Sequence, residues 1–263
     1  PNGDIIKSTK EPVAKVGPTM APDYQPIDIE LERGKIPRGK GVFLRGSLTP
    51  LKLSDYPIKT AKDAGISWVN IWVYKILKNG TEVIRDIGSI KTFIDEYHKN
   101  GIKCYIYGWA AIGAGKGYNE AAFKKQHNGQ EPEDMFIKNM INIAIETGAM
   151  GVDIDAEEDC HAKGTSVENT PGKYSYSTEV VERNETFARK LSEQCKNYKL
   201  SFGYTSTTPA SWSIKSGHYF KSWGKYCDYV IPQTYSATGF HGPIHWKKGY
   251  NNYAAEGFKN IIP

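Results

Sequence analysis

The chain of 263 residues lacks several features that would place it in a common functional class. No apolar run is long enough to cross a bilayer, so we expect no membrane span. The four cysteines stand far apart without a Cys-x-x-Cys pair, which argues against a structural zinc site. No basic stripe accompanies the mild net charge of +5, so nucleic acid is not an expected partner. We also expect no cofactor, and no Gly-rich phosphate turn follows the first predicted strand.

Residues 1–40 differ in character from the rest of the chain. They are charged, carry few periodic apolar positions and contain Pro12, Pro18, Pro22, Pro26 and Pro37, which predicts an extended Pro-rich leader or a segment that wraps a surface. The chain begins at Pro1 without a visible signal peptide, so a targeting segment could already have been removed. Asn-x-Thr triplets at Asn79 and Asn184 fit a secreted or extracellular protein.

Residues 41–263 show alternating strand and helix patterns. Apolar, β-rich runs predict strands at Gly41–Arg45, Trp68–Lys75, Lys103–Trp109, Met150–Asp155, Leu200–Tyr204 and Tyr229–Thr234. Helical periodicity lies between them, at Asp55–Ala64, Ser89–Asn100, Glu133–Thr147, Thr178–Tyr198 and Ser213–Lys225. Ser89 is the expected N-cap of its helix, and the next long helix should end at Thr147-Gly148. This alternation predicts an α/β domain with a parallel sheet, most simply a (β/α)8 barrel of the TIM type.

The number of strand–helix units is too small to close such a barrel. A sixth helix is expected near Asn251–Phe258, and residues 260–263 look like the start of a seventh strand. An eight-stranded barrel needs more chain than this. We therefore expect a barrel that is incomplete at the C-terminus of this chain, either truncated or completed by another polypeptide.

The most informative segment runs from Gly151 to Glu157. On a strand, Asp153, Asp155 and Glu157 point to one side, and the apolar residues between them point to the other. The mutual repulsion of three carboxylates raises at least one pKa, and a carboxylic acid that is protonated near neutral pH can act as a general acid. The alternative is that these acids are solvated or hold helix N-termini at the end of a strand.

The acid row resembles the D-G-x-D-x-D-x-E signature of glycoside hydrolase family 18, the chitinases and endo-β-N-acetylglucosaminidases. Gly151, Asp153, Asp155 and Glu157 match that signature, whereas Met150 stands where the family has its first Asp. A second segment, 228–235, is similar to the family's sixth-strand motif, in which a Met or Gln precedes a Tyr by two residues; here these are Gln233 and Tyr235.

The resemblance implies a glycosidase that cleaves β-linked N-acetylglucosamine in chitin, glycoprotein glycans or peptidoglycan. Glu157 would protonate the glycosidic oxygen, while the substrate's own acetamido oxygen attacks the anomeric carbon. Asp155 would orient and stabilise the acetamido group, Asp153 would share a proton with Asp155, and Tyr235 with Gln233 would hold the acetyl oxygen.

Aromatic residues near predicted strand ends are candidates for sugar contacts, namely Tyr107, Trp109 and Tyr204, although such residues also fill cores. The chain departs from the family at the third strand, which lacks the usual Ser-x-Gly-Gly, and at the eighth strand, which is absent. A divalent metal held by Asp153 with Glu158, Asp159 and His161 is an alternative, but we expect no metal.

Two other functions stay open. These are a non-catalytic carbohydrate-binding or structural protein on the same fold, and a different barrel hydrolase such as a muramidase or a metal-dependent esterase.

Overall fold

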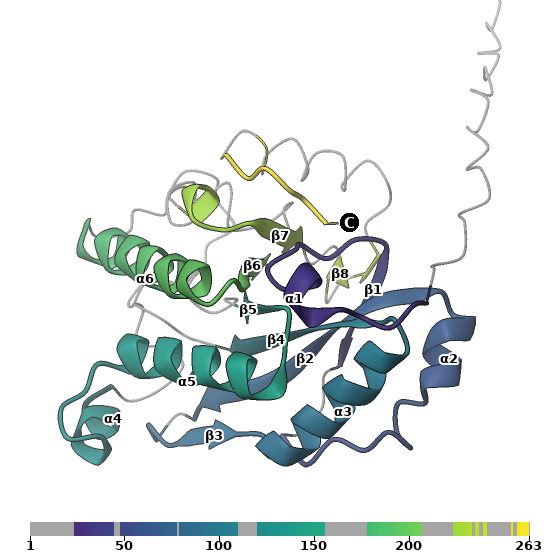
Figure 1. The fold of residues 1–263 in the computed structure, drawn as a ribbon. Coiled ribbons are helices and arrows are strands. Elements are labelled where there is room, and N and C mark those ends of the chain that lie inside the picture. Colours follow the sequence, from purple (N-terminus) through teal and green to yellow (C-terminus); the bar gives the residue numbers. More distant parts are fainter. Residues whose placement is uncertain are drawn as a thin grey trace, which may run out of the picture.

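The computed structural model describes residues 24–44, 48–77, 79–109, 120–155, 178–206, 223–232, 235–236, 239–240, 254 and 257–262. One sheet dominates this part of the chain and curls into a half-barrel (Figure 1). Its parallel strands follow the order β1-β2-β4-β5-β6-β7, with bounds Lys40–Leu44, Ile66–Ile76, Lys103–Trp109, Gly151–Asp155, Ser201–Ser206 and Tyr229–Pro232. The predicted parallel sheet and incomplete α/β barrel are therefore confirmed.

One short strand adds to this sheet, and two others form a separate two-stranded sheet. The strand β3 (Glu82–Ile84) pairs antiparallel with β2, and the strands β8 (Tyr235–Ser236) and β9 (Gly239–Phe240) pair with each other. Beyond β7, Ile261 forms a parallel bridge with Val230. The amide of Val230 donates to the carbonyl of Asn260 and the amide of Ile262 donates to the carbonyl of Val230, each at 2.9 Å. The seventh strand predicted at residues 260–263 thus begins beside β7.

Helices cover the outer face of the sheet (Figure 1). Their bounds are α2 Ile58–Asp63, α3 Ile87–Lys99, α4 Glu120–Gln126, α5 Pro132–Thr147 and α6 Thr178–Asn197, with a 3-10 turn η2 at Trp223–Lys225. The sequence patterns predict neither the helix α4 nor the strand β3. The helix expected at Ser213–Lys225 is described only at η2, and the helix expected near Asn251–Phe258 lies mostly outside the described residues. No helix of the described part combines the length and the hydropathy that a membrane span requires.

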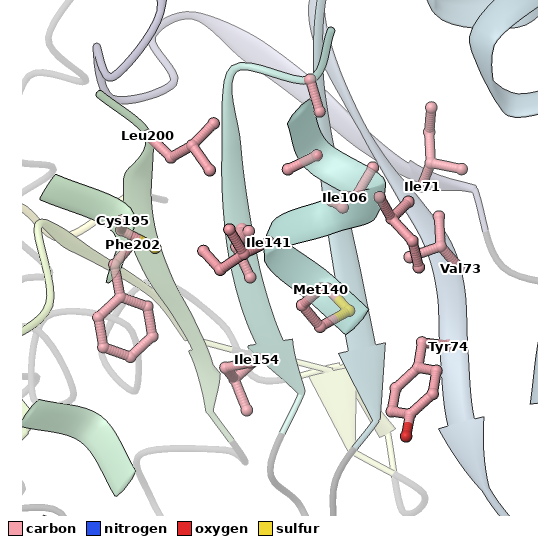
Figure 2. Packing of buried hydrophobic residues seen from close by; sticks show 14 of the residues in the cluster. Ile71, Val73, Tyr74, Ile106, Met140, Ile141, Ile154, Cys195, Leu200 and Phe202 are labelled. Carbon is pink, nitrogen blue, oxygen red and sulfur yellow. The ribbon is translucent and has the colours of Figure 1, made fainter. Parts of the chain in front are cut away.

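The main core lies between the sheet and these helices. The helix α5 buries Met140 and Ile141, which Figure 2 shows among Ile106 of β4 and Ile154 of β5. Buried residues recur every three or four positions along α5, as at Phe136, Met140 and Ala144, which is the apolar stripe that the sequence pattern predicts. The helix ends as expected, because Gly148 takes the left-handed conformation (φ +76°) that closes a helix C-terminus.

The start of α3 corrects one prediction. Asp86 caps this helix, and its carboxylate accepts a hydrogen bond from the amide of Ser89 at 2.7 Å. Ser89 lies three residues further on and donates its hydroxyl to the carbonyl of Asp86 at 2.8 Å. Asp86 stands directly before the first residue of α3, and its carboxylate accepts from a first-turn amide that has no partner within the helix. The N-cap is therefore Asp86 and not Ser89.

Residues 24–39 pack against the N-terminal edge of the sheet, although the sequence groups them with an extended leader. They contain the short helix α1 (Ile29–Glu32). The amide of Gly34 donates to the carbonyl of Met150 at 3.1 Å, and the amide of Ile27 donates to the carbonyl of His98 at 2.8 Å. This segment closes the end of the half-barrel that lies opposite the C-terminal ends of the parallel strands.

Candidate active site

The inward face of the sheet carries a row of chemically distinctive residues. The strand registers place Trp72, Tyr107, Asp153, Gly203 and Tyr229 side by side on β2, β4, β5, β6 and β7. Paired residues of neighbouring strands point to the same side of a sheet, while successive residues alternate. The predicted inward direction of Asp153 follows from its neighbours Val152 and Ile154, which lie in the core on the helix side.

A second row lies one step nearer the C-terminal edge of the sheet. It contains Lys75, Trp109, Asp155, Thr205 and Ile231, again in register from β2 to β7. Asp155 is the last residue of β5 and Trp109 is the last residue of β4. The structure therefore brings both predicted acids of β5 and the predicted sugar contact Trp109 together at the edge where barrel enzymes place their sites.

Asp153 is fully buried among polar groups from three other strands. Burial raises the pKa of Asp153 to about 7, although the nearby polar groups of Thr205, Tyr229 and Asn70 oppose that rise. Asn70, Thr205 and Tyr229 are themselves buried. A carboxyl with this pKa changes protonation near neutral pH, so that it can hold or release one proton beside Asp155.

The aromatic residues on β2 and β4 form a continuous surface next to the acids. Tyr107 lies parallel to Trp72, with ring centroids 6.4 Å apart, and meets Phe43 of β1 edge-on at 5.4 Å. The ammonium of Lys75 lies 5.2 Å from the ring centre of Trp72. Trp72 and Trp109 are only partly buried, unlike Tyr107. Both indole rings keep some exposed surface, Trp72 within the aromatic cluster and Trp109 at the end of β4, where it also packs against the main core.

The structure corrects the assignment of Tyr204. This residue pairs in register with Ile154 and lies on the helix side of β6, where it packs against Trp223 (4.9 Å between ring centroids) and Phe258. Alternation along the strand gives the inward position to its neighbour Thr205 instead. Tyr204 therefore belongs to the core and does not lie beside the acids.

Three further candidates are described in part or not at all. Tyr235 begins β8, of which the backbone pairing with Phe240 is described. Glu157 and Gln233 lie outside the described residues, as do the candidate metal ligands Glu158, Asp159 and His161. In the part of the chain that is described, no three His, Cys, Asp or Glu residues come together as a metal site.

Below the acid row, the interior of the half-barrel is apolar. Met150, which stands in place of the first Asp of the signature, is fully buried in a cluster with Trp68, Tyr105, Tyr229 and Ile231. Ile27, Ile29 and Ile36 of the N-terminal segment pack against the same cluster. An ionised carboxylate at position 150 would be buried among aromatic and aliphatic side chains, so that methionine suits the position.

Sequence reasoning missed Asn70, Trp72 and Tyr229 as members of the site. Each shares the inward face of its strand with the residues two positions away. Asn70 is a polar residue within the apolar run Trp68–Tyr74. A buried polar residue in such a run needs a partner inside the sheet. That signal was available in the sequence, although it does not say which partner is meant.

The fold and the inward acid row define a half-barrel of the kind found in chitinases. A chitinase from Bacteroides thetaiotaomicron is similar over 85% of this chain and 66% of its own, with a TM-score of 0.58 and 16% identity. The spore cortex-lytic enzyme SleL from Bacillus cereus is similar over 86% and 52%, with a TM-score of 0.55 and 14% identity. A chitinase from Chromobacterium violaceum is similar over 85% and 67%, with a TM-score of 0.54 and 13% identity.

This similarity concerns the fold. The chain spans about half to two thirds of the length of solved chains that it matches, for example 54%, 48% and 66%. No family model matches the sequence, and no curated protein matches it. The support for the resemblance to chitinases thus comes from the path of the backbone, which is independent of the acid row in the sequence.

Proposed function

We propose that this protein is a glycosidase that hydrolyses β-linked N-acetylglucosamine polymers or glycans with retention of configuration. The observation that carries the proposal is the inward placement of Asp153 and Asp155 at the C-terminal edge of a chitinase-like half-barrel. Chitin and peptidoglycan lie outside the cytoplasm, and the proposal accordingly includes a secreted protein.

In the proposed reaction, Glu157 donates its proton to the glycosidic oxygen as the bond from that oxygen to the anomeric carbon breaks. The acetamido oxygen of the same sugar forms the replacing bond to the anomeric carbon, so that no protein nucleophile is required. Water then attacks the anomeric carbon and gives its proton to Glu157, which restores the acid and the acetamido group. Two displacements at one carbon leave the configuration unchanged.

The two buried acids support this reaction by managing charge. Asp155 accepts a hydrogen bond from the acetamido N–H. Positive charge develops on this group as its oxygen attacks the anomeric carbon, and the carboxylate of Asp155 stabilises that charge. Asp153 lies next along the inward face, and its pKa of about 7 lets it take up or release one proton near neutral pH. A proton held by Asp153 leaves Asp155 free to carry the negative charge.

The partly buried rings of Trp109 and Trp72 supply the proposed sugar contacts. Trp109 is in register with Asp155, and Trp72 lies one strand further away beside Tyr107. Aromatic faces suit the apolar faces of sugar rings, and neighbouring strands are about 4.8 Å apart. A glycan that crosses the strands can therefore place one sugar at Asp155 and another over the aromatic surface.

A second candidate is a protein of the same fold that binds glycans without cleaving them. The observation that favours it is Met150, which replaces the first acid of the signature with an apolar side chain. The choice between the two functions depends on whether Glu157 acts as an acid, and this can be measured.

The test compares Glu157→Gln with the matched control Glu158→Gln on an oligomer of N-acetylglucosamine. A general acid contributes about 10²–10⁴-fold to the rate, so Glu157→Gln should lose at least about 100-fold while Glu158→Gln stays near the wild type. Undiminished hydrolysis in Glu157→Gln contradicts the proposed acid. A bound oligomer that stays intact with the wild-type protein supports the binding function instead, and loss of hydrolysis on addition of a chelator supports metal-dependent chemistry.

A further inference from the structure

Tyr229 reaches toward Asp153 across a glycine. Tyr229 and Asp153 both pair in register with Gly203, one from each side. A Cβ atom at position 203 would lie 2.1 Å from Cζ of Tyr229 and 2.4 Å from its hydroxyl oxygen. The phenol ring therefore occupies the space that any larger residue at position 203 would fill. Its hydroxyl extends toward the strand that carries Asp153.

The surroundings of this hydroxyl offer it few other acceptors. Tyr229 is 1% exposed, and within the described residues neither its hydroxyl nor either carboxylate oxygen of Asp153 makes an ordinary hydrogen bond. Tyr105 packs edge-on against Tyr229 at 6.2 Å between ring centroids, but its own hydroxyl donates to the carbonyl of Lys35 at 2.8 Å. The hydroxyl of Tyr105 thus has a partner away from the acid row, whereas the hydroxyl of Tyr229 has none among the described residues.

We propose that Tyr229 is a positioning residue, whose hydroxyl donates a hydrogen bond to the Asp153 carboxylate across Gly203 and thereby controls where the proton of the acid row resides. This inference rests on the proposed function, and it concerns how that site is prepared for the reaction. Burial raises the pKa of Tyr229 far above its ordinary value, so that the phenol keeps its proton and stays a donor throughout the neutral range.

The groups around the pair come from every neighbouring element. Asp155 follows on the same strand, Tyr105 and Tyr107 come from β4, Cys227 and Asp228 precede β7, and Cys195 comes from α6. Burial raises the pKa of each of these thiols, and Asp228 is occupied by the amide of Phe202 at 2.8 Å. The uncharged donors beside Asp153 are Asn70 and Thr205. No cation of the described residues is among the groups that act on the Asp153 carboxyl.

The test measures the titration of the Asp153 carboxyl directly, by carbon NMR of protein labelled at the aspartate side-chain carbonyl carbon, with Asp153→Asn to assign the signal. Tyr229→Phe keeps the ring and removes the hydroxyl. Loss of a donor to the ionised form disfavours that form, so the midpoint should rise by roughly one pH unit. The matched control Tyr105→Phe should leave the midpoint unchanged. The same midpoint in Tyr229→Phe and wild type overturns the inference.

A second measurement covers the case in which Tyr229→Phe does not fold. In wild-type protein labelled at tyrosine Cζ, one tyrosine signal should shift with the same midpoint as the Asp153 carboxyl, and no such signal would overturn the inference. Because these titrations need no substrate, they can succeed when hydrolysis is absent. Where hydrolysis is found, the pH profile of kcat/KM should move upward in Tyr229→Phe and not in Tyr105→Phe.

Discussion

Replacing Met150 by aspartate restores the first acid of the signature, and the structure predicts that this change destabilises the protein. Met150 is fully buried among aromatic and aliphatic side chains. Loss of its packing costs about 2–4 kcal/mol. At pH 7 the new carboxyl must also be held protonated in the folded state, which costs about 4 kcal/mol relative to an unfolded pKa near 3.9. The sum is comparable to the whole stability of a typical domain, about 5–15 kcal/mol.

Urea denaturation at pH 4 and at pH 7 separates the two contributions. A buried acid with a raised pKa is tolerated below its unfolded pKa and becomes unfavourable as the pH rises toward its folded pKa. The defect of Met150→Asp should therefore be larger at pH 7 than at pH 4 by about 3–4 kcal/mol. Met150→Asn should show a defect that is independent of pH, and Met150→Leu should cost less than about 1.5 kcal/mol. An equal defect of Met150→Asp at both pH values would refute the dry layer beneath the acid row.

Three further predictions concern stability. Because its pKa is raised, Asp153 keeps its proton in the folded state between about pH 4 and pH 7, whereas the unfolded chain loses it. The free energy of unfolding of the wild type should therefore fall over this window by on the order of 4 kcal/mol. Urea denaturation at a series of pH values should show this fall in the wild type and not in Asp153→Asn. Arg183 pairs with the buried carboxylate of Glu133, so Arg183→Gln should lower the free energy of unfolding by about 1–2 kcal/mol. The control Arg189→Gln removes an exposed pair with Glu193 and should lower it by less than about 0.5 kcal/mol in the same assay. Equal losses would contradict the difference in burial between the two pairs. Asp86→Ala should lower the melting temperature by removing the cap of α3, at a cost of about 1 kcal/mol, and an unchanged temperature would contradict the capping role.

The sequence predicts the parallel strands well because each has β-rich apolar residues and is separated from the next by a helical pattern. The strand β2 is an example, since Trp68–Lys75 is predicted and Ile66–Ile76 is found. Short elements such as β3 and α1 escape prediction, because three or four residues carry no periodicity and these segments owe their form to contacts with distant parts of the chain.

The candidate site is predictable only along one strand at a time. The alternation Asp153, Asp155 is visible in the sequence, because both acids stand on the same short strand. The contributions of Asn70 and Tyr229 depend on register between strands, which local patterns do not contain. Tyr204 shows the reverse error, because a one-residue difference in position moves a side chain from the inner to the outer face.

One expected surface feature also changes in the structure. The triplet at Asn184 fits a glycan acceptor in sequence, yet Asn184 is fully buried on α6. A glycan needs an exposed asparagine, so that this triplet does not support secretion. Localisation therefore stays part of the proposed function.

The most direct measurement of the central claim compares an oligomer of N-acetylglucosamine with its fully deacetylated counterpart, following the anomeric protons of the first products by NMR. If the acetamido oxygen is the nucleophile and the acid row serves it, the acetylated oligomer is cleaved to the β-anomer and the deacetylated oligomer is not cleaved. Equal cleavage of both oligomers, or an α-anomer as the first product, would contradict the account.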